Sequence, residues 1–261
     1  MNKIVKTVVV IAALAAALAG GVYLGRASKS DMVITSSAGG AEYSGGFKAA
    51  GEAAEKVQAA ANAGSLKSVA GPPGPHSVVV KDGESILQAV KNAEPGTTIR
   101  VMPGTYSETV YIDKDNIRII GVIEAGRRPV LDGKKQLNDA ILYSGNNFVL
   151  ENFEIRNYKG NGFFVVNNAG YTFNHLWAQN VGTYGIYAFN TIGGTIKNSE
   201  ASYNNDAGFY IGQTPPQDKP KRTFVSNIKS WGNVLGWSGT NMKYVTIKDS
   251  DFYNNGTGLV P

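Results

Sequence analysis

Apolar and polar residues repeat together from Asn146 to the last residue, Pro261. A glycine followed by a large apolar residue recurs at intervals of 23, 23, 28 and 22 residues, at Gly162, Gly185, Gly208, Gly236 and Gly258. An apolar column precedes these glycines in every unit, at Leu150, Phe173, Ile196, Val225 and Ile247. Self-similarity at a period of about 20 to 50 residues indicates a stacked repeat architecture.

Short strands are the predicted content of each unit. Apolar and polar residues alternate with a period of two, as in residues 148–151 and 185–188. No unit holds a helical pattern long enough for a helical solenoid or a leucine-rich repeat. Two or three short strands bent at Asn and Gly suit one coil of a parallel β-helix, whose coils bury a continuous core by stacking. We therefore predict an all-β parallel β-helix.

A polar column accompanies the glycines, at Asn152, His175, Asn198, Asn227 and Asp249. Asn and Asp adopt left-handed backbone angles more readily than most residues, so these positions are predicted to be corners of the coils. His175 invites a catalytic interpretation, but its column favours a corner residue that hydrogen-bonds its neighbours. Asp249 fits the same interpretation.

The part of the chain before the repeats predicts a cap for the solenoid. Strands are expected at 78–80, 98–101, 108–112 and 116–121, and an amphipathic helix at 85–92. A solenoid needs such an element to cover its first coil. At the other end, residues 254–261 begin a strand and stop, so we expect a chain truncated at its C-terminus or completed by a partner.

The opening of this region resembles a known superfamily. Gly-Glu-Ser-Ile-Leu-Gln-Ala-Val at 83–90, Pro-Gly-Thr-Tyr-Ser-Glu at 103–108 and Arg-Pro-Val-Leu-Asp-Gly at 128–133 are similar to passages of pectate-lyase-like right-handed parallel β-helix proteins. The resemblance covers residues 77–261 and implies a right-handed helix. It implies no single function, because lyases, hydrolases, esterases, epimerases, phage spikes and non-catalytic proteins share this scaffold.

None of the catalytic signatures of those enzymes occurs here. The hydrolases' Asp-Asp pair, Gly-His-Gly and Arg-x-Lys segments are absent, as is the epimerases' Asp-Pro-His-Asp segment. The repeat also lacks the compact cluster of aspartates with which the resembled lyases bind calcium. The sequence therefore predicts no cofactor, and calcium, although possible, has no support.

Two outward columns carry the candidate site residues. If Ile186 points inward, Tyr187 points outward, and the same alternation turns Phe164 and Tyr210 outward on neighbouring coils. This aromatic column is open to three interpretations: a ladder that stabilises the sheet, a platform for sugar rings, or a protein contact. These three residues and Trp177 are the candidate substrate-binding residues.

The second column holds Glu154, Trp177 and Glu200, with Arg156 beside Glu154. Carboxylates two coils apart are separated by about 9–10 Å, near the upper end of the range for an inverting glycosidase. Glu154, Glu200 and Arg156 are therefore the candidate catalytic residues. The alternative is a solvated face that Lys229 partly neutralises. Residues 214–222 form an expected corner loop, whose basic residues suit an acidic glycan or simply solubility.

Composition and charge narrow the class of protein. Among 261 residues there is no cysteine and there are two histidines, which excludes a disulfide framework and leaves little scope for a histidine metal site. Residues 1–26, with an apolar run at 7–25, predict a signal peptide or a retained membrane anchor. Without the three basic residues of this leader, the rest of the chain has 22 basic against 20 acidic residues. This near-neutral balance gives no support for nucleic-acid binding.

The predicted organisation is therefore a leader at 1–26, an Ala/Gly/Ser-rich linker at 27–76 and a β-helix at 77–261. We expect an exported protein, secreted, periplasmic or held at the cell surface. Its expected function is to bind polysaccharide, or to serve as a scaffold on it, without catalysis. The alternative is a polysaccharide-active enzyme, a lyase, glycoside hydrolase or epimerase, whose active site this chain does not reveal.

Overall fold

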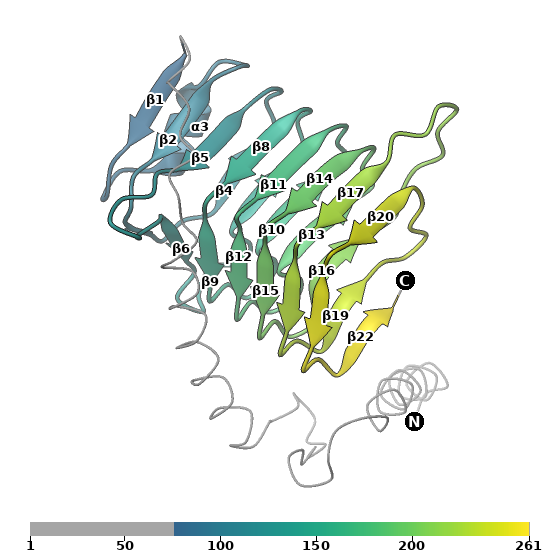
Figure 1. Cartoon of the computed structure of the whole chain (residues 1–261). Helices are drawn as coiled ribbons and strands as arrows, with labels where there is room; N and C mark the ends of the chain where they lie inside the picture. The colour runs from purple at the N-terminus through teal and green to yellow at the C-terminus, as the bar shows by residue number, and fades with distance from the viewer. Residues whose placement is uncertain (1–75, 261) are drawn as a thin grey trace, which may run out of the picture. The chain divides into compact units, whose positions relative to one another are not determined.

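A computed structural model of the chain describes residues 76–260 (Figure 1). The predicted leader at 1–26 and all but residue 76 of the predicted linker lie outside the described residues. Within the described part, three parallel sheets and one short helix account for the regular structure. No helix in residues 76–260 is both long and apolar enough to cross a membrane.

The strands belong to three sheets, named I, II and III. Sheet I contains, in order, β1 (Ser77–Val80), β2 (Thr98–Val101), β5 (Arg118–Gly121), β8 (Phe148–Glu151), β11 (Tyr171–Asn174), β14 (Gly194–Lys197), β17 (Thr223–Ser226) and β20 (Val245–Lys248). Sheet II contains β3 (Thr105–Tyr106), β6 (Val130–Asp132), β9 (Glu154–Arg156), β12 (Trp177–Gln179), β15 (Glu200–Ser202), β18 (Lys229–Trp231) and β21 (Asp251–Tyr253). Sheet III contains β4 (Val110–Ile112), β7 (Ile141–Tyr143), β10 (Phe163–Val166), β13 (Ile186–Phe189), β16 (Ala207–Ile211), β19 (Leu235–Ser238) and β22 (Thr257–Val260).

From β2 onward the chain visits sheets I, II and III in turn, so each round trip is one coil of a β-helix (Figure 1). Each strand pairs in parallel with the equivalent strand one coil away. Leu150, Phe173 and Ile196 are direct partners on β8, β11 and β14, as the apolar column predicts. The prediction of an all-β parallel β-helix is therefore confirmed.

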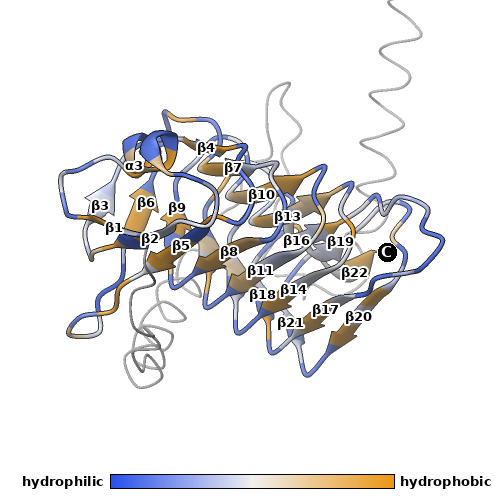
Figure 2. Ribbon diagram, turned by 90° about the horizontal axis from the view of Figure 1, so that it is seen from above, coloured by the Kyte–Doolittle hydropathy of each residue, from blue (hydrophilic) through white to orange (hydrophobic). Residues whose placement is uncertain are grey.

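The core lies inside the three sheets, where the inward residues of successive coils stack. Alternation is visible in the strands, since the first and third residues of β10 and β13 are buried and the second and fourth are partly exposed. Figure 2 shows the same division, with apolar colour along the strands and polar colour at many corners. Burial of apolar surface at about 25 cal/mol per Å² is the main force that holds such a stack together.

The corners carry the polar columns that the sequence predicts. Asn152, His175, Asn198, Asn227 and Asp249 all have positive φ, between 50° and 65°. Neighbouring amides bond along this corner, where Asn227 Nδ2 donates to Asn198 Oδ1 at 2.8 Å. The repeated glycines have a different cause. A Cβ on Gly185 would lie 2.7 Å from the carbonyl oxygen of Gly208 on the next coil, and of the five glycines only Gly258, on the last coil, has room for a side chain.

A second, buried ladder runs along the corner between sheets II and III. Asn204 Oδ1 accepts from Val181 N, Asn233 Oδ1 accepts from Asn204 N, and Asn255 Oδ1 accepts from Asn233 N, at 2.9–3.1 Å. Each side chain thus satisfies a backbone N–H of the preceding coil, which would otherwise be buried without a partner. Asn204 and Asn233 are themselves almost completely buried.

The helix α3 (Ile86–Asn92) follows β1 and packs on β1, β2 and β4, in the place of a cap. Ile86 and Val90 face the core, and Ser85, predicted as the first helical residue, is the N-cap. Glu108 accepts from Ile86 N and Leu87 N at 2.7 and 3.1 Å, and Lys114 Nζ donates to the carbonyls of Val90, Lys91 and Ala93 at 2.6–3.1 Å. Both ends of the helix are thereby held by residues that flank β4.

Several predicted strand boundaries differ from the structure. The strand expected at 116–121 begins at Arg118, as β5, because Asn116 has a left-handed backbone angle, with φ 60°. Residues 105–106, which lie between two of the expected strands, form β3 and pair with β6. Glu108 and Thr109 precede β4 instead of belonging to it, because Glu108 caps α3 and Thr109 bonds the carbonyl of Asp139. Residues 214–222 contain no strand and connect β16 to β17, as the expected corner loop does.

Candidate functional site

One column of outward residues runs along sheet III. Register pairs Tyr111 with Leu142, Leu142 with Phe164, Phe164 with Tyr187, and Tyr187 with Tyr210. The predicted alignment of Phe164, Tyr187 and Tyr210 is thus present, one residue per coil. Tyr111, at the start of the column, is 55% exposed.

The rings of this column contact one another. Phe164 and Tyr187 stack with centroids 4.2 Å apart and planes 10° apart, whereas Tyr187 and Tyr210 meet edge to face at 5.0 Å. Tyr184, from the corner before β13, packs on both Tyr187 and Tyr210 at 4.7–4.8 Å. Tyr210 is consequently only 8% exposed, although its side chain points outward as predicted. Phe164, Tyr187 and Tyr210 thus form a packed ladder of rings on sheet III.

Tyr184 is a residue that sequence reasoning missed. Its hydroxyl is hydrogen-bonded to the carboxyl group of Asp206, from the next coil. Burial raises the pKa of Tyr184 and of Tyr187 to about 12, so both hydroxyls are protonated at neutral pH. Burial also raises the pKa of Asp206 above its ordinary value, against the effect of the hydrogen bond from Tyr184. No strand pattern could identify Tyr184, because it lies in a corner.

Sheet II carries the second predicted column. Trp177 pairs with Glu154 on one side and with Glu200 on the other, and Glu200 pairs with Lys229. The three candidate residues are thus adjacent, as predicted. They are not a uniformly solvated face, however, because Glu200 is only 7% exposed. Trp177 is partly exposed, and its indole N–H donates to Ser202 Oγ at 3.3 Å.

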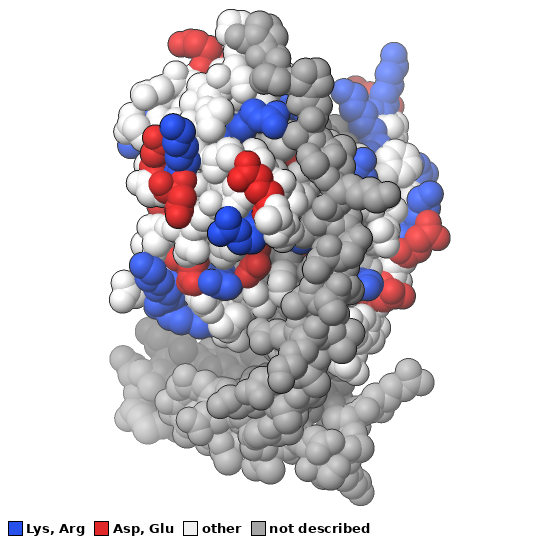
Figure 3. Space-filling model, turned by 60° about the vertical axis from the view of Figure 1, so that its left-hand side comes forward, with Lys and Arg blue, Asp and Glu red and all other residues white. Residues whose placement is uncertain are grey.

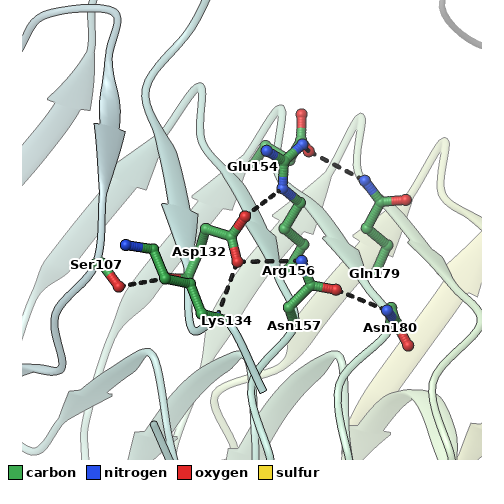
Figure 4. A network of polar contacts seen from close by, with 8 residues as sticks. All are labelled: Ser107, Asp132, Lys134, Glu154, Arg156, Asn157, Gln179 and Asn180. Atoms are coloured by element: carbon green, nitrogen blue, oxygen red, sulfur yellow. Dashed lines mark hydrogen bonds and ion pairs between the residues drawn. The ribbon is translucent and has the colours of Figure 1, made fainter. Parts of the chain in front are cut away.

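Arg156 belongs to a closed network of polar side chains (Figure 4). Its guanidinium donates to Asp132 Oδ2 at 2.9 Å and to Glu154 Oε1 at 3.2 Å. Gln179 also donates to Glu154, at 3.0 Å, and Asn157 to Asp132, at 3.1 Å. Burial raises the pKa of Asp132, but its hydrogen bonds and Arg156 lower it by more. Arg156 and Glu154 are therefore already paired with each other.

Glu200 lies in a different environment from Glu154. Burial raises the pKa of Glu200, although the hydrogen bond from Trp231 Nε1, at 2.7 Å, and the charges of Lys229 and Arg128 oppose this shift. Lys229, which the sequence predicts to neutralise part of this column, is the direct register partner of Glu200. Arg128, from the connection between β5 and β6, lies near both carboxylates, and burial lowers its pKa. Strand periodicity could not find Arg128, since it belongs to no repeat unit.

His175, the remaining residue with a possible catalytic interpretation, lies at a corner of the β-helix. His175 has φ 52° at its corner, as predicted, but its Nδ1 atom is buried without a hydrogen-bond partner. Burial and the charge of Arg128 lower the pKa of His175. Within residues 76–260, no three His, Asp or Glu side chains group as metal ligands. Figure 3 shows acidic and basic side chains interspersed on the face that it presents.

Two solved structures share this architecture. Pectate lyase Pel9A superposes with a TM-score of 0.55 and 18% identity over 71% of this chain, and a rhamnogalacturonan lyase with 0.54 and 16% over 71%. The chain has the right-handed parallel β-helix fold of pectate-lyase-like proteins. The predicted fold and handedness are thereby confirmed.

The comparison extends no further than the fold of this β-helix. The chain spans 56% of the length of the pectate lyase and 62% of that of the rhamnogalacturonan lyase. No family model matches the sequence, and no curated protein matches it either. The side chains of the β-helix are therefore the basis for inferring its function.

Proposed function

We propose that this β-helix binds polysaccharide along the outer face of sheet III. The observation that carries the proposal is the column Phe164, Tyr187 and Tyr210, in register on consecutive coils. Equivalent side chains recur about every 4.8 Å along the stack, so an extended chain lying across the coils meets a similar contact on each. The two solved structures that share the fold are named as lyases of polysaccharides, which supports a polysaccharide as the ligand of this chain.

Sugars suit the groups that this face offers. Sugar rings carry apolar C–H surfaces beside hydroxyl groups, and tyrosine offers an apolar ring together with a hydroxyl that both donates and accepts. Because Phe164 and Tyr187 cover each other's faces, their edges and the hydroxyls of Tyr184 and Tyr187 form the proposed contacts. Trp177, on sheet II, is a separate proposed contact. The proposal places the protein outside the cytoplasm, in accord with the leader predicted at 1–26.

The test is binding of the full chain to a panel of polysaccharides, by affinity electrophoresis and calorimetry. Tyr187→Ala should weaken binding about ten-fold or more, because it removes the central ring of the column. Phe224→Ala is the matched control, since Phe224 points outward from sheet I and is 52% exposed. Equal binding by both variants, or binding to no polysaccharide, would contradict the proposal.

A second candidate function is glycoside hydrolysis with inversion at sheet II. The specific observation in its favour is the unequal environment of two carboxyl groups: Glu154 is paired with Arg156, whereas burial raises the pKa of Glu200. Such a division is typical of a general base and a general acid. Their strands are two spacings apart, about 9.6 Å, close to the range in which a water fits between the carboxylates.

This candidate predicts that Glu200→Gln and Glu154→Gln each lower the hydrolysis rate about a hundredfold or more. The measurement is release of reducing ends from polysaccharides, with the anomeric configuration of the product followed by NMR. Asp251→Asn, on the exposed end of the same sheet, is the control and should retain full activity. Absence of new reducing ends with the wild-type protein leaves binding as the function.

A further inference from the structure

Sheets II and III differ sharply in the number of charged residues on their strands. None of the seven strands of sheet III contains Asp, Glu, Lys or Arg. By contrast, five of the seven strands of sheet II carry at least one charged residue, with Asp132, Glu154, Arg156, Glu200, Lys229 and Asp251 among their residues. The aromatic column therefore lies on an uncharged sheet.

The residues that border sheet III add negative charge. Within two residues of the ends of its strands, the charged side chains are those of Glu108, Asp113, Asp139, Asp206 and Lys114. Lys114 donates to three carbonyls at the end of α3, at 2.6–3.1 Å, so its ammonium group is already engaged. Asp206 lies beside the column itself, where its carboxyl group is bonded to Tyr184.

We propose that the sheet III face selects uncharged polysaccharides and rejects polyuronates. This inference rests on the proposed binding function and names the class of its ligand. A uronate carboxylate laid on this face would lose water without gaining a cation or a cluster of donors, and desolvation of an unpaired charge is costly. Sites for carboxylates use arginine in bidentate geometry, and no strand of sheet III supplies one. A neutral sugar ring brings hydroxyl groups that the tyrosines can pair.

Basic residues do occur in the connections that flank sheet III, namely Lys134, Lys135, Lys159 and Lys243, and three more are grouped in the corner loop at 214–222. Lys219, Lys221 and Arg222 lie in the connection between β16 and β17, and Lys221 approaches Gly193 at the entry to sheet I. An acidic chain bound by this loop would depend on these three residues and not on Tyr187. The loop thus provides a means of separating the two modes of binding.

The experiment compares matched ligands that differ in charge alone. Affinities of the full chain are measured for polygalacturonate and alginate and for their carboxyl-reduced, uncharged forms, beside neutral glucan and xylan, at pH 7 and about 0.15 M salt. We expect binding to uncharged chains that Tyr187→Ala weakens about ten-fold and Phe224→Ala does not change. Affinity for the polyuronates should be weaker than that for the uncharged chains by about ten-fold or more. Asp206→Asn should strengthen polyuronate binding about three-fold by removing one like charge.

The outcomes separate this inference from the function on which it rests. Tyr187-dependent binding of polyuronates as tight as, or tighter than, that of their reduced forms overturns the inference and leaves the binding function standing. Binding of no chain of either kind overturns both. Polyuronate binding that survives Tyr187→Ala but is lost when Lys219, Lys221 and Arg222 are changed to Ser supports the inference, provided that uncharged chains still require Tyr187. Circular dichroism of each variant verifies that the β-helix is folded.

Discussion

His175 occupies a corner position whose equivalents on other coils are asparagine or aspartate. Its backbone has φ 52°, and its Nδ1 atom is buried without a partner. Left-handed backbone angles are tolerated best by Gly, and next by Asn and Asp, whose short polar side chains bond locally. The two neighbouring coils, at Asn152 and Asn198, use asparagine in this way.

His175→Asn should therefore stabilise the β-helix, by about 1 kcal/mol at pH 7. Burial and Arg128 lower the pKa of His175, so protonation is easier in the unfolded chain, and stability is lost as pH falls below 6.5. The asparagine variant should lack that loss. The measurement is urea unfolding of both proteins between about pH 5 and pH 8, a range that spans the ordinary pKa of histidine.

The other histidine provides the control for this prediction. His76 is exposed at the first described position, so His76→Asn should change the stability little. An unchanged pH dependence in His175→Asn would contradict the role assigned to burial at this corner.

Among the elements, α3 depends most on side chains from elsewhere in the chain. Seven residues are too few for a helix to be stable alone in water. Glu108 places a carboxylate at its N-terminal N–H groups, and Lys114 places an ammonium at its C-terminal carbonyls. Both charges have the sign that the helix dipole favours.

Glu108→Ala and Lys114→Met should each lower the free energy of unfolding by about 1–2 kcal/mol. Their effects should add in the double variant, because the two side chains act on opposite ends of the helix. Thermal unfolding measures both. Lys91→Met is the matched control: Lys91 is an exposed lysine in the last turn of the same helix, and its loss should change the melting temperature little.

The strands show how far a sequence pattern reaches and where it stops. Period-two alternation predicts that Tyr187 and Trp177 point outward and fall in register with their neighbours, and both do. Exposure does not follow from alternation. Tyr210 and Glu200 point outward but are buried, because Tyr184 covers the first and Trp231 bonds the second. Contacts from corners and other coils have no periodic signature, so Arg128 and Tyr184 had to come from the structure.

At the scale of the whole β-helix, each coil depends on its immediate neighbours. Asn233 exemplifies this dependence: its side chain bonds Asn204, Ala201 and Ser230 and is 4% exposed. Quasi-one-dimensional stacks of this kind can open locally, coil by coil.

Asn233→Ala should cost about 2–3 kcal/mol, since it leaves several buried polar groups without partners. Hydrogen exchange should accelerate in β16, β18 and β19 while β1 and β2 stay protected, because few contacts carry the defect along the stack. Asn205→Ala, at an exposed neighbouring position, is the control. Uniform acceleration throughout the chain would show a fully cooperative β-helix instead.

Because equivalent positions recur once per coil, they mark regular distances along the β-helix. Tyr111 and Ser238 stand in one column five strands apart, a span of about 24 Å. Spin labels placed one at a time on successive coils, at exposed positions beside that column, would report where a bound oligomer starts, how many coils it covers and in which direction it runs.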